Sequence, residues 1–468
     1  MPNSFPVSPP DSAWLRMENP TNPMTITGIV GFGSRLDVAD LRDFVGERLV
    51  RFDRFRMRID GLGSSSPRWV EDPDFDLDRH IFEVALPAPG GREGLQSLVS
   101  DLMSQPLSFA HTPWTFHLVH DVDDGSGRVG SAIIVRIHHV VGDGIALMHV
   151  LINAVDEYFD EDSPTRKKRR ASKPALQKRV AKTLKNAGAE TVDLVTKPTH
   201  LGRRLKTAGS GLGAVGHLFA MRPDSQTVLK GSASPNKRAA WTDPIDLQLI
   251  KSVGKALDAK VNDVLMTAAG GALRRYLHAK GDPVDQSTVR VAAPFNVRPL
   301  DRAYELGNSF GLAFVSLPIE FETIRQRLEA LKERMDEVKK SAEPIVVYGI
   351  LQTIGRAPMW VHRQVVKMFS QKASGVLTNV PGPTELLHIK GAPIDTIMFW
   401  VPQAGDIGLG ISIISLNDRV RVGVTSDAAI IPNPSELARA FEAEFAALVD
   451  EFAPAGAVEA SRKRAAIG

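Results

Sequence analysis

The stretch from Ser131 to Met148, SAIIVRIHHVVGDGIALM, constrains the fold more than any other part of the chain. It begins with an apolar run that is typical of a buried strand and ends that run with two adjacent histidines, His138 and His139. Successive side chains of a strand point to opposite faces of the sheet. The two histidines therefore cannot both face one substrate unless the strand breaks between them.

A helix is predicted directly after the histidines. Gly142 and Gly144 relax the turn, and Asp143 suits the N-cap position of a helix. The apolar residues that follow recur at helical spacing: Ile145, Met148, Leu151, Ile152, Val155 and Phe159. The unit is strand, histidine, glycine turn and helix, so His139 projects from the end of an element, where a rigid scaffold can present it to a cleft.

Elsewhere the chain mixes strands with helices, which predicts an α/β fold class. Alternation predicts a half-exposed strand in DRFRMRI (53–59). Further strands are predicted in TVRVAAPF (288–295), GLAFVSLPI (311–319), GLGISIISL (408–416) and RVRVGVTS (419–426). Helical periodicity is plain in IRQRLEALKERMDEVKK (324–340) and in NPSELARAFEAEFAALVDEF (433–452).

At 468 residues the chain is too long for one ordinary core, so we expect two lobes. The predicted boundaries are an N-terminal lobe over 1–160, a linker over 161–235 with helical pieces, a C-terminal lobe over 236–452, and a loose tail over 453–468. Between Glu161 and Glu190 the linker carries ten Lys/Arg against three Asp/Glu. It is either a solvated linker or a basic surface for anionic lipid headgroups, where each cation contributes about 1 kcal/mol.

Composition excludes several classes of site. The chain has no cysteine, so it has no disulfide and no thiolate zinc site, which fits a reducing compartment. We expect no secretory signal, because the first residues lack a basic segment followed by an apolar one, and no membrane-spanning helix. Nucleic acid is not expected as a partner, since no aromatic residues interleave with the basic run RKKRR.

A histidine presented in this way could act as a general base, because neutral imidazole accepts a proton near neutral pH. Two alternatives stay open on the residues alone. A single histidine is more often a hydrogen-bonded core residue, and two histidines with an aspartate could bind a metal. No metal is expected, because no HExxH motif, cysteine or further His/Asp cluster completes a set of ligands.

The string HHVVGDG resembles the HHxxxDG motif of acyltransferases with the chloramphenicol-acetyltransferase-like fold, a group that includes peptide-synthetase condensation domains. From about Pro9 to Phe452 the chain resembles the bacterial wax ester synthase/diacylglycerol acyltransferase family within that group. The stretches that carry this resemblance occur in the family's order: SPPDSAWLRMENPTNPM, QPLSFAHTPW, VNDVLMTAAGGALRRYL, AAPFNVRP and LTNVPGP. Where the family usually has Pro-Leu-Trp, this chain has Thr112-Pro113-Trp114.

The resemblance implies two chloramphenicol-acetyltransferase-like lobes with the active-site channel between them. It implies transfer of an acyl group from acyl-CoA to a hydroxyl, with His139 as the base that deprotonates the acceptor and then protonates the CoA thiolate. His138 is expected to support it. We expect Asp143 to fix the turn through an ion pair with Arg298. No Gly-x-Ser-x-Gly elbow is visible, so a covalent acyl-enzyme has no obvious carrier.

Further site residues are assigned from the matching motifs. Substrate contacts are expected from Gly144, Asn262, Asp263 and Trp114. For Asn262 a role as an oxyanion or acceptor contact and a role as a helix N-cap are equally favoured. Structural roles, as a rigid turn that shapes the channel wall, are expected for Asn379, Pro381 and Gly382.

The expected co-substrate is acyl-CoA, with no cofactor, and the expected acceptor is diacylglycerol or a long-chain alcohol. Since these acceptors reside in membranes or lipid bodies, we expect a cytoplasmic chain that docks peripherally on the inner face of the membrane or on lipid bodies. Two alternatives remain: a related acyltransferase with another acceptor, and a non-catalytic lipid-binding or lipid-droplet protein.

Overall fold

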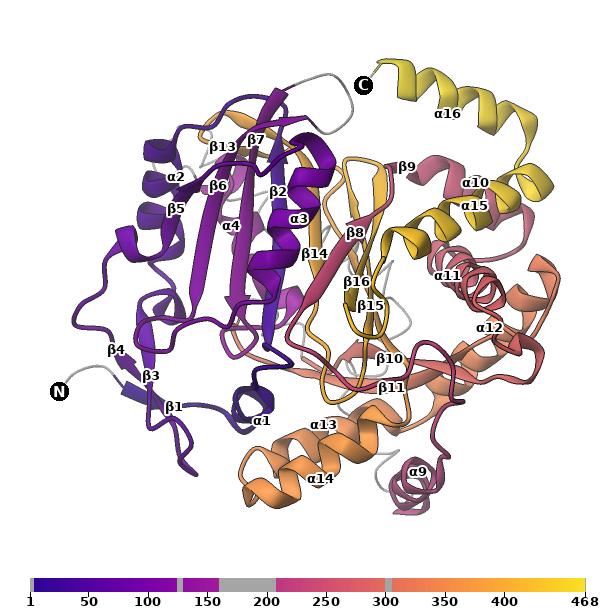
Figure 1. Ribbon diagram of the computed structural model, residues 1–468, viewed down its shortest axis with the longest axis horizontal. Helices are drawn as coiled ribbons and strands as arrows, with labels where there is room; N and C mark the ends of the chain where they lie inside the picture. Colours follow the sequence, from indigo (N-terminus) through magenta and orange to yellow (C-terminus); the bar gives the residue numbers. More distant parts are fainter. Residues whose placement is uncertain (1–3, 124–128, 160–207, 299–304, 468) are drawn as a thin grey trace.

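The computed structural model describes residues 4–123, 129–159, 208–298 and 305–467 (Figure 1). Most of the basic linker, including RKKRR, therefore lies outside the described residues. The fold is mixed α/β, as predicted, and consists of two lobes that are each built on a large sheet. None of the described helices is long and apolar enough to cross a bilayer.

The N-terminal lobe has a six-stranded sheet in the order β13-β14-β2-β7-β6-β5. Its strands are β2 (Thr25–Phe32), β5 (Ile81–Val84), β6 (Trp114–Asp123), β7 (Val129–His138), β13 (His388–Ile389) and β14 (Ala392–Trp400). A separate small sheet contains β1 (Ser4–Pro6), β4 (Arg68–Glu71) and β3 (Met57–Asp60). The helices of this lobe are α1 (Pro9–Met17), α2 (Val38–Phe44), α3 (Gly91–Met103), α4 (Gly144–Ala154) and α5 (Asp156–Phe159).

The C-terminal lobe has a seven-stranded sheet in the order β11-β10-β12-β15-β16-β8, with β9 paired to β16. Its strands are β8 (Lys237–Trp241), β9 (Ile245–Asp246), β10 (Val289–Asn296), β11 (Phe310–Leu317), β12 (Gly375–Pro381), β15 (Leu409–Leu416) and β16 (Arg419–Asp427). Its helices are α9 (Ala208–Ala220), α10 (Leu247–Ala256), α11 (Val261–Ala279), α12 (Ile324–Lys340), α13 (Glu343–Ile354), α14 (Met359–Ser370), α15 (Ser435–Phe452) and α16 (Ala455–Ile467).

The division at residue 236 does not separate the two sheets. Strand β14 leaves the C-terminal lobe and pairs antiparallel with β2, with Met398 opposite Ile29, so it completes the sheet of the N-terminal lobe. In Figure 1 this orange strand stands beside the purple ones. Its partner, β2, lies more than 350 residues earlier in the sequence, and local periodicity cannot predict such a long-range pairing.

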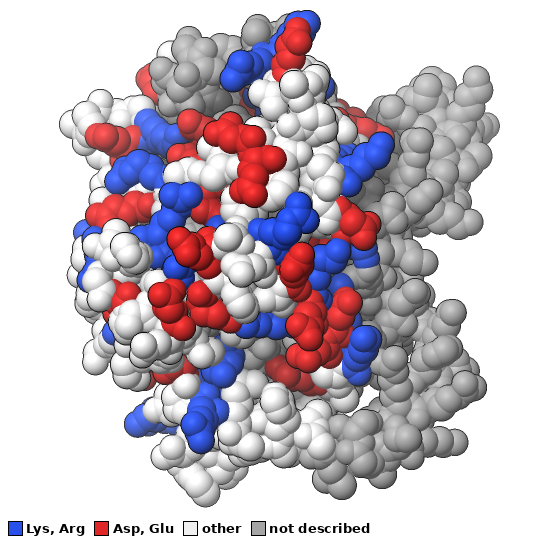
Figure 2. Space-filling view, turned by 90° about the vertical axis from the view of Figure 1, so that its right-hand side faces the viewer, with Lys and Arg blue, Asp and Glu red and all other residues white. Residues whose placement is uncertain are grey.

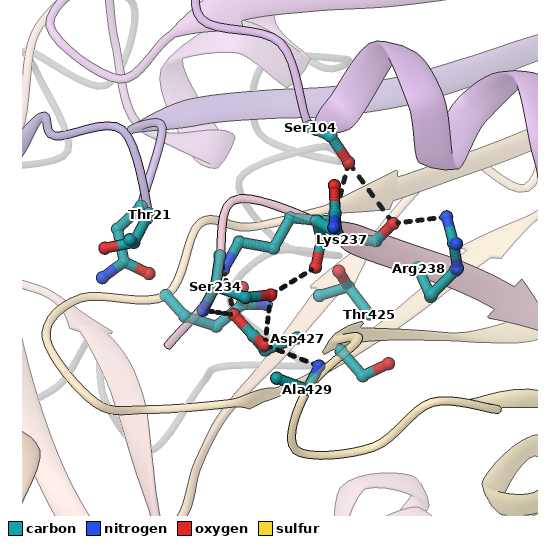
Figure 3. Close-up of polar contacts among 12 residues, drawn as sticks. Thr21, Ser104, Ser234, Lys237, Arg238, Thr425, Asp427 and Ala429 are labelled. Carbon is teal, nitrogen blue, oxygen red and sulfur yellow. Dashed lines mark hydrogen bonds and ion pairs between the residues drawn. The ribbon is translucent and has the colours of Figure 1, made fainter. Parts of the chain in front are cut away.

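A second connection joins the lobes where the end of α3 meets β8 and β16 (Figure 3). The ammonium of Lys237, on β8, lies 2.7 Å from a carboxylate oxygen of Asp427, on β16, and both side chains are buried. Ser104, just after α3, accepts the backbone N–H of Lys237 at 2.8 Å, and Ser234 donates to Asp427 at 2.8 Å. This polar cluster ties a helix of one lobe to the sheet of the other.

Two local predictions are wrong. The C-terminal stretch is not a loose tail, because α16 spans Ala455–Ile467 and packs on α10, with Arg464 2.6 Å from Asp246. Alanine-rich sequence favours a helix even without an amphipathic stripe. In 53–59, only the part from Met57 onward is a strand, because Asp53–Phe55 form a 3₁₀ turn.

Candidate active site

The histidines lie where β7 gives way to α4. Strand β7 ends at His138, and Asp143 caps α4 by accepting the N–H of Ala146 at 2.9 Å. The expected ion pair is present: Arg298, which follows β10 in the other lobe, lies 2.7 Å from the Asp143 carboxylate, and both are buried. The turn after the histidines is therefore braced against the C-terminal lobe.

Both ring nitrogens of His138 have protein neighbours. Its Nδ1 accepts the backbone N–H of Val140 at 3.0 Å, so the ring proton of the neutral form is on Nε2. That Nε2 lies 3.3 Å from a carboxylate oxygen of Glu18, in the loop after α1. No ring nitrogen of His138 is left to accept a proton from a substrate.

His139 differs, because a side chain from the other lobe fixes its tautomer. The amide Nδ2 of Asn308 donates to Asp11 Oδ1 at 2.8 Å and to the His139 carbonyl at 2.7 Å. The Asn308 oxygen must then be the atom that faces His139 Nδ1, at 2.7 Å. Since that oxygen only accepts, Nδ1 of His139 carries the proton and Nε2 keeps a free lone pair.

Asp11, on α1, anchors this arrangement. The carboxylate is fully buried, accepts the backbone N–H of Asn308 at 2.8 Å, and lies 3.0 Å from the guanidinium of Arg54. Arg54 also donates to the carbonyl of Val140 at 2.9 Å. At Gly307, φ is +117°, a conformation that L side chains rarely adopt, so glycine is required next to Asn308.

Aromatic rings enclose the imidazole of His139. Trp14 stacks on it with the ring centroids 4.2 Å apart and the planes 10° apart, and Phe310 of the other lobe lies 5.8 Å away. His139 is only 4% exposed. Burial lowers its pKa to about 4, although the charge of Asp143 and the hydrogen bond to Asn308 act in the opposite direction. The ring is thus neutral near pH 7 and can accept a proton at Nε2.

Two cavities flank the junction between α4 and β12. The first, of about 130 Å³, lies between α4 and the sheet of the N-terminal lobe and is lined almost only by apolar side chains. The second, of about 700 Å³, lies in the C-terminal lobe at the start of α11. Gly144 and Val380 line the first, while Asn379 and Pro381, its neighbours on β12, line the second. Strand alternation thus sends adjacent residues of β12 into different cavities. Neither of these cavities is lined by His138 or His139.

The larger cavity brings together most of the expected substrate and wall residues. It is lined by Asn262, Asp263, Asn379, Pro381 and Gly382. The Asn379 amide donates to the Asn262 side-chain oxygen at 3.0 Å.

Asn262 is not the N-cap of α11, which was one of its two predicted roles. Lys260 is the N-cap residue. The side chain of Asp263, three residues later, accepts the backbone N–H of Lys260 at 3.0 Å and so supplies the capping hydrogen bond. The helix begins two residues earlier than its sequence pattern predicts, a usual uncertainty for an element boundary.

The prediction of a substrate contact for Trp114 is not supported. Its side chain is 1% exposed, its Nε1 donates to the carbonyl of Phe55 at 3.0 Å, and its ring stacks on His80 at 4.3 Å. Trp114 lines neither cavity. As the first residue of β6 it points into the core of its lobe.

The LTNVPGP stretch is a strand rather than a turn over most of its length. Residues Gly375–Pro381 pair in parallel with β15. The backbone N–H of Gly382 donates to Ser415 at 3.2 Å, and a Cβ there would lie 2.0 Å from the Ser415 carbonyl oxygen. Glycine is needed because the two backbones approach closely.

Asp11, Trp14 and Asn308 contact His139 directly or through one residue, although no sequence signal predicts a role for them. Asp11 and Trp14 stand in SPPDSAW, a stretch that carries the family resemblance but no recognisable catalytic signal. Asn308 has no local signal. It is 169 positions from His139 in the sequence, and only the packing of the lobes brings the two together.

Two family models match the chain. The wax ester synthase/diacylglycerol acyltransferase catalytic domain matches residues 7–265, more than half of the chain. The WS/DGAT C-terminal domain matches residues 306–449.

Curated relatives include a probable diacylglycerol O-acyltransferase of Mycobacterium tuberculosis, which is 25% identical over 86% of this chain and 86% of its own length. The O-acyltransferase WSD of Acinetobacter baylyi is 24% identical over 94% and 96%. Among solved structures, the wax ester synthase/diacylglycerol acyltransferase from Marinobacter aquaeolei VT8 matches with a TM-score of 0.66, 22% identity and coverage of 95% and 98%. The starter condensation domain of rhizomide synthetase, in complex with C8-CoA and Leu-SNAC, matches with a TM-score of 0.57, 12% identity and coverage of 95% and 94%.

Proposed function

Because the chain belongs to the wax ester synthase/diacylglycerol acyltransferase family, we propose that it transfers a long-chain acyl group from acyl-CoA to a hydroxyl of diacylglycerol, of a long-chain alcohol, or of both. The printed activities of the mycobacterial and Acinetobacter relatives support O-acyl transfer. The C8-CoA complex of the condensation domain shows that this fold can hold an acyl-CoA.

The free lone pair on Nε2 of His139 is the observation that carries the proposal. In the proposed reaction Nε2 takes the proton of the acceptor hydroxyl as its oxygen attacks the thioester carbonyl. The tetrahedral intermediate collapses, the C–S bond breaks, and the same proton passes from Nε2 to the CoA sulfur. General-base help of this kind typically contributes about 10²–10⁴-fold.

The low pKa of His139 keeps the ring neutral and favours the return of the proton, although it makes the ring a weaker base than free imidazole. A ring that is neutral at pH 7 can accept the proton, and the imidazolium that results is acidic enough to protonate the departing thiolate. Asp143 is 2.7 Å from Arg298 and caps α4, so its proposed role is to brace the turn rather than to contact substrate. His138 holds the backbone at Val140, which is a supporting role.

The two cavities suggest where the substrates lie. The apolar cavity under α4 suits an acyl chain, since its walls offer almost no polar partner. The larger cavity has Lys251, Lys260 and Lys339 in its lining, together with Asn262, and suits the anionic part of acyl-CoA. Gly144 lines the apolar cavity, and a Cβ there would lie 3.9 Å from Val380. Acyl-CoA is a co-substrate in this scheme, and no cofactor takes part.

The proposed acceptors are carried in a lipid phase, so the chain would dock peripherally on the inner face of the membrane or on lipid bodies. This part of the proposal rests on the chemistry of the acceptors, because a long-chain alcohol or diacylglycerol is scarcely present free in water.

The purified protein, incubated with radiolabelled palmitoyl-CoA and either diacylglycerol or hexadecanol, tests the proposal by its neutral-lipid products. We expect triacylglycerol, wax ester or both, and a loss of at least about 100-fold in His139→Ala. His278→Ala, an exposed histidine at the end of α11, is the matched control and should keep full activity.

A His139→Ala protein that folds and keeps wild-type turnover would refute the assigned base. If the wild-type protein binds these lipids but forms no product with any hydroxyl or amine acceptor, the chain is a lipid-binding protein that has kept the fold, and the enzymatic proposal fails.

A further inference from the structure

Helix α14 carries one exposed stripe with an unusual composition. Trp360, Arg363, Gln364 and Lys367 follow the spacing i, i+3, i+4 and i+7, which puts them on one face of the helix, and all four are exposed. The indole of Trp360 is 71% exposed. A single exposed aromatic residue is ordinary on the surface of a soluble protein. Here, however, the tryptophan shares one face of the helix with two cations, a combination that can indicate a binding surface.

The sequence around this stripe is rich in positive charge. No aspartate or glutamate occurs between Pro344 and Thr384, and Arg356, in the turn before α14, is exposed. Within the described residues, Arg356, Arg363 and Lys367 form no ion pair. Their charges are not neutralised by the protein itself, so they are available to an external anion.

Helix α9 extends the same end of the molecule. It packs on α13, and the Lys372 ammonium, just beyond α14, donates to the carbonyl of Met221, just after α9, at 2.7 Å. Phe219 on α9 is 56% exposed. Figure 1 places α9, α13 and α14 at one end. In Figure 2 blue and red atoms are interspersed over most of the described surface, whereas the lowest described part of this view is white and blue.

This end is joined to the candidate active site by α1. His362, on the buried side of α14, contacts the carbonyl of Ala13 at 3.2 Å. The next residue, Trp14, stacks on His139. The exposed stripe and the catalytic ring are therefore connected through two packed helices.

We propose that the exposed face of α14, with Trp360, Arg356, Arg363 and Lys367, docks on an anionic phospholipid surface, with Phe219 of α9 as a second apolar contact. The indole, which has an apolar body and a polar N–H, suits the headgroup level of a bilayer, and the cations suit anionic headgroups. The docking surface itself does not depend on the proposed function. Its benefit does rest on that function, because docking here would bring α1 and His139 close to the lipid that supplies the acceptor.

Sedimentation with phosphatidylcholine vesicles, with and without phosphatidylglycerol, tests this surface. The wild-type protein should bind only the vesicles that contain phosphatidylglycerol, and added salt should weaken the binding. The triple variant Arg356→Glu/Arg363→Glu/Lys367→Glu should lower the partition coefficient by at least about tenfold, given the attraction of each cation. Trp360→Ala should lower it less, and without changing its dependence on salt.

The matched control reverses three exposed cations on helices at another part of the surface. Lys255, Arg439 and Arg462, on α10, α15 and α16, likewise form no ion pair within the described residues. The Lys255→Glu/Arg439→Glu/Arg462→Glu variant has the same net charge as the test variant, and it should bind vesicles like the wild type. Equal losses in the two triple variants would overturn the proposal, because net charge rather than this face would then govern binding.

Binding that is absent, that does not depend on phosphatidylglycerol, or that survives both α14 variants also overturns it. Transferase activity toward a short, water-soluble alcohol separates this inference from the proposed function. The α14 variants should keep that activity while they lose activity toward acceptors in vesicles. If the wild-type protein binds vesicles as expected but transfers no acyl group, the docking surface stands and the proposed function fails.

Discussion

At the scale of single residues, the partner of one ring nitrogen separates two adjacent histidines. His138 uses Nδ1 as an acceptor for the N–H of Val140, whereas His139 uses Nδ1 as a donor to Asn308. The choice of tautomer decides which atom of each ring is basic. Asn308 is itself oriented by Asp11, so a helix at the start of the chain sets the state of a histidine in the middle of it.

Asn308→Leu tests this positioning role. Leucine cannot accept the Nδ1 proton, so the imidazole would lose its fixed tautomer, and we expect kcat to fall by at least about tenfold with KM little changed. Loss of the group that orients a catalytic imidazole costs up to about 10⁴-fold elsewhere. Steady-state kinetics with palmitoyl-CoA and hexadecanol would measure it. A proportional rise in KM with unchanged kcat would instead make Asn308 a substrate contact.

At the scale of elements, α1 is the piece on which the site depends. It supplies Asp11 and Trp14 to the surroundings of His139, and Ser12 donates to the carbonyl of Gly355 at 2.9 Å. Arg16 donates to the carbonyl of Ala357 at 2.6 Å. The contact is close: a Cβ on Gly355 would lie 1.9 Å from the carbonyl oxygen of Pro9.

Gly355→Ala should therefore push α1 away from α13. We expect a loss of stability of about 1–3 kcal/mol, the usual range for overpacking, together with reduced turnover although no substrate contact is altered. Gly349→Ala on the same helix is the control, since a Cβ there meets nothing within 4 Å. It should stabilise the protein by about 0.5–1 kcal/mol. Denaturant unfolding measures both, and equal effects would show that the approach of α1 is not tight.

At the scale of the whole molecule, the two lobes are not independent units. Strand β14 belongs to one lobe by sequence and to the other by pairing, and α3 packs on β8 across the boundary. The site itself is split: His139 and Asp143 come from one lobe, and Asn308 and Arg298 from the other. Separation of the lobes would therefore dismantle the site.

The buried pair of Lys237 and Asp427 tests how firmly β8 is held in the sheet of the C-terminal lobe, where it meets α3 of the other lobe. Lys237→Met leaves Asp427 buried without its counter-charge, and we expect about 3–5 kcal/mol of destabilisation. Lys463→Met removes an exposed pair with Glu459 and should change stability by less than about 1 kcal/mol. Urea unfolding followed by fluorescence gives both values. A Lys237→Met protein as stable as the wild type would mean that the buried pair between β8 and β16 is dispensable.

The elements whose signals are local can be predicted from the sequence. Strand alternation separated His138 from His139, the glycines and Asp143 located the turn and its helix, and helical periodicity located 324–340. The ion pair of Asp143 with Arg298 was also expected, because each residue stands in a motif of the family that the chain resembles. These features depend on neighbours within a few residues or on a recognisable pattern.

The partners that come from distant parts of the chain are set by the packing of the two lobes. Asp11 and Asn308 support His139, β14 completes the sheet of the other lobe, and Trp114 packs in the core of its own lobe. None of these contacts produces a local periodicity or spacing that could be recognised in the sequence. They arise because burial of two apolar sheets brings together residues hundreds of positions apart, and buried polar groups must then find hydrogen-bond partners among whatever lies beside them.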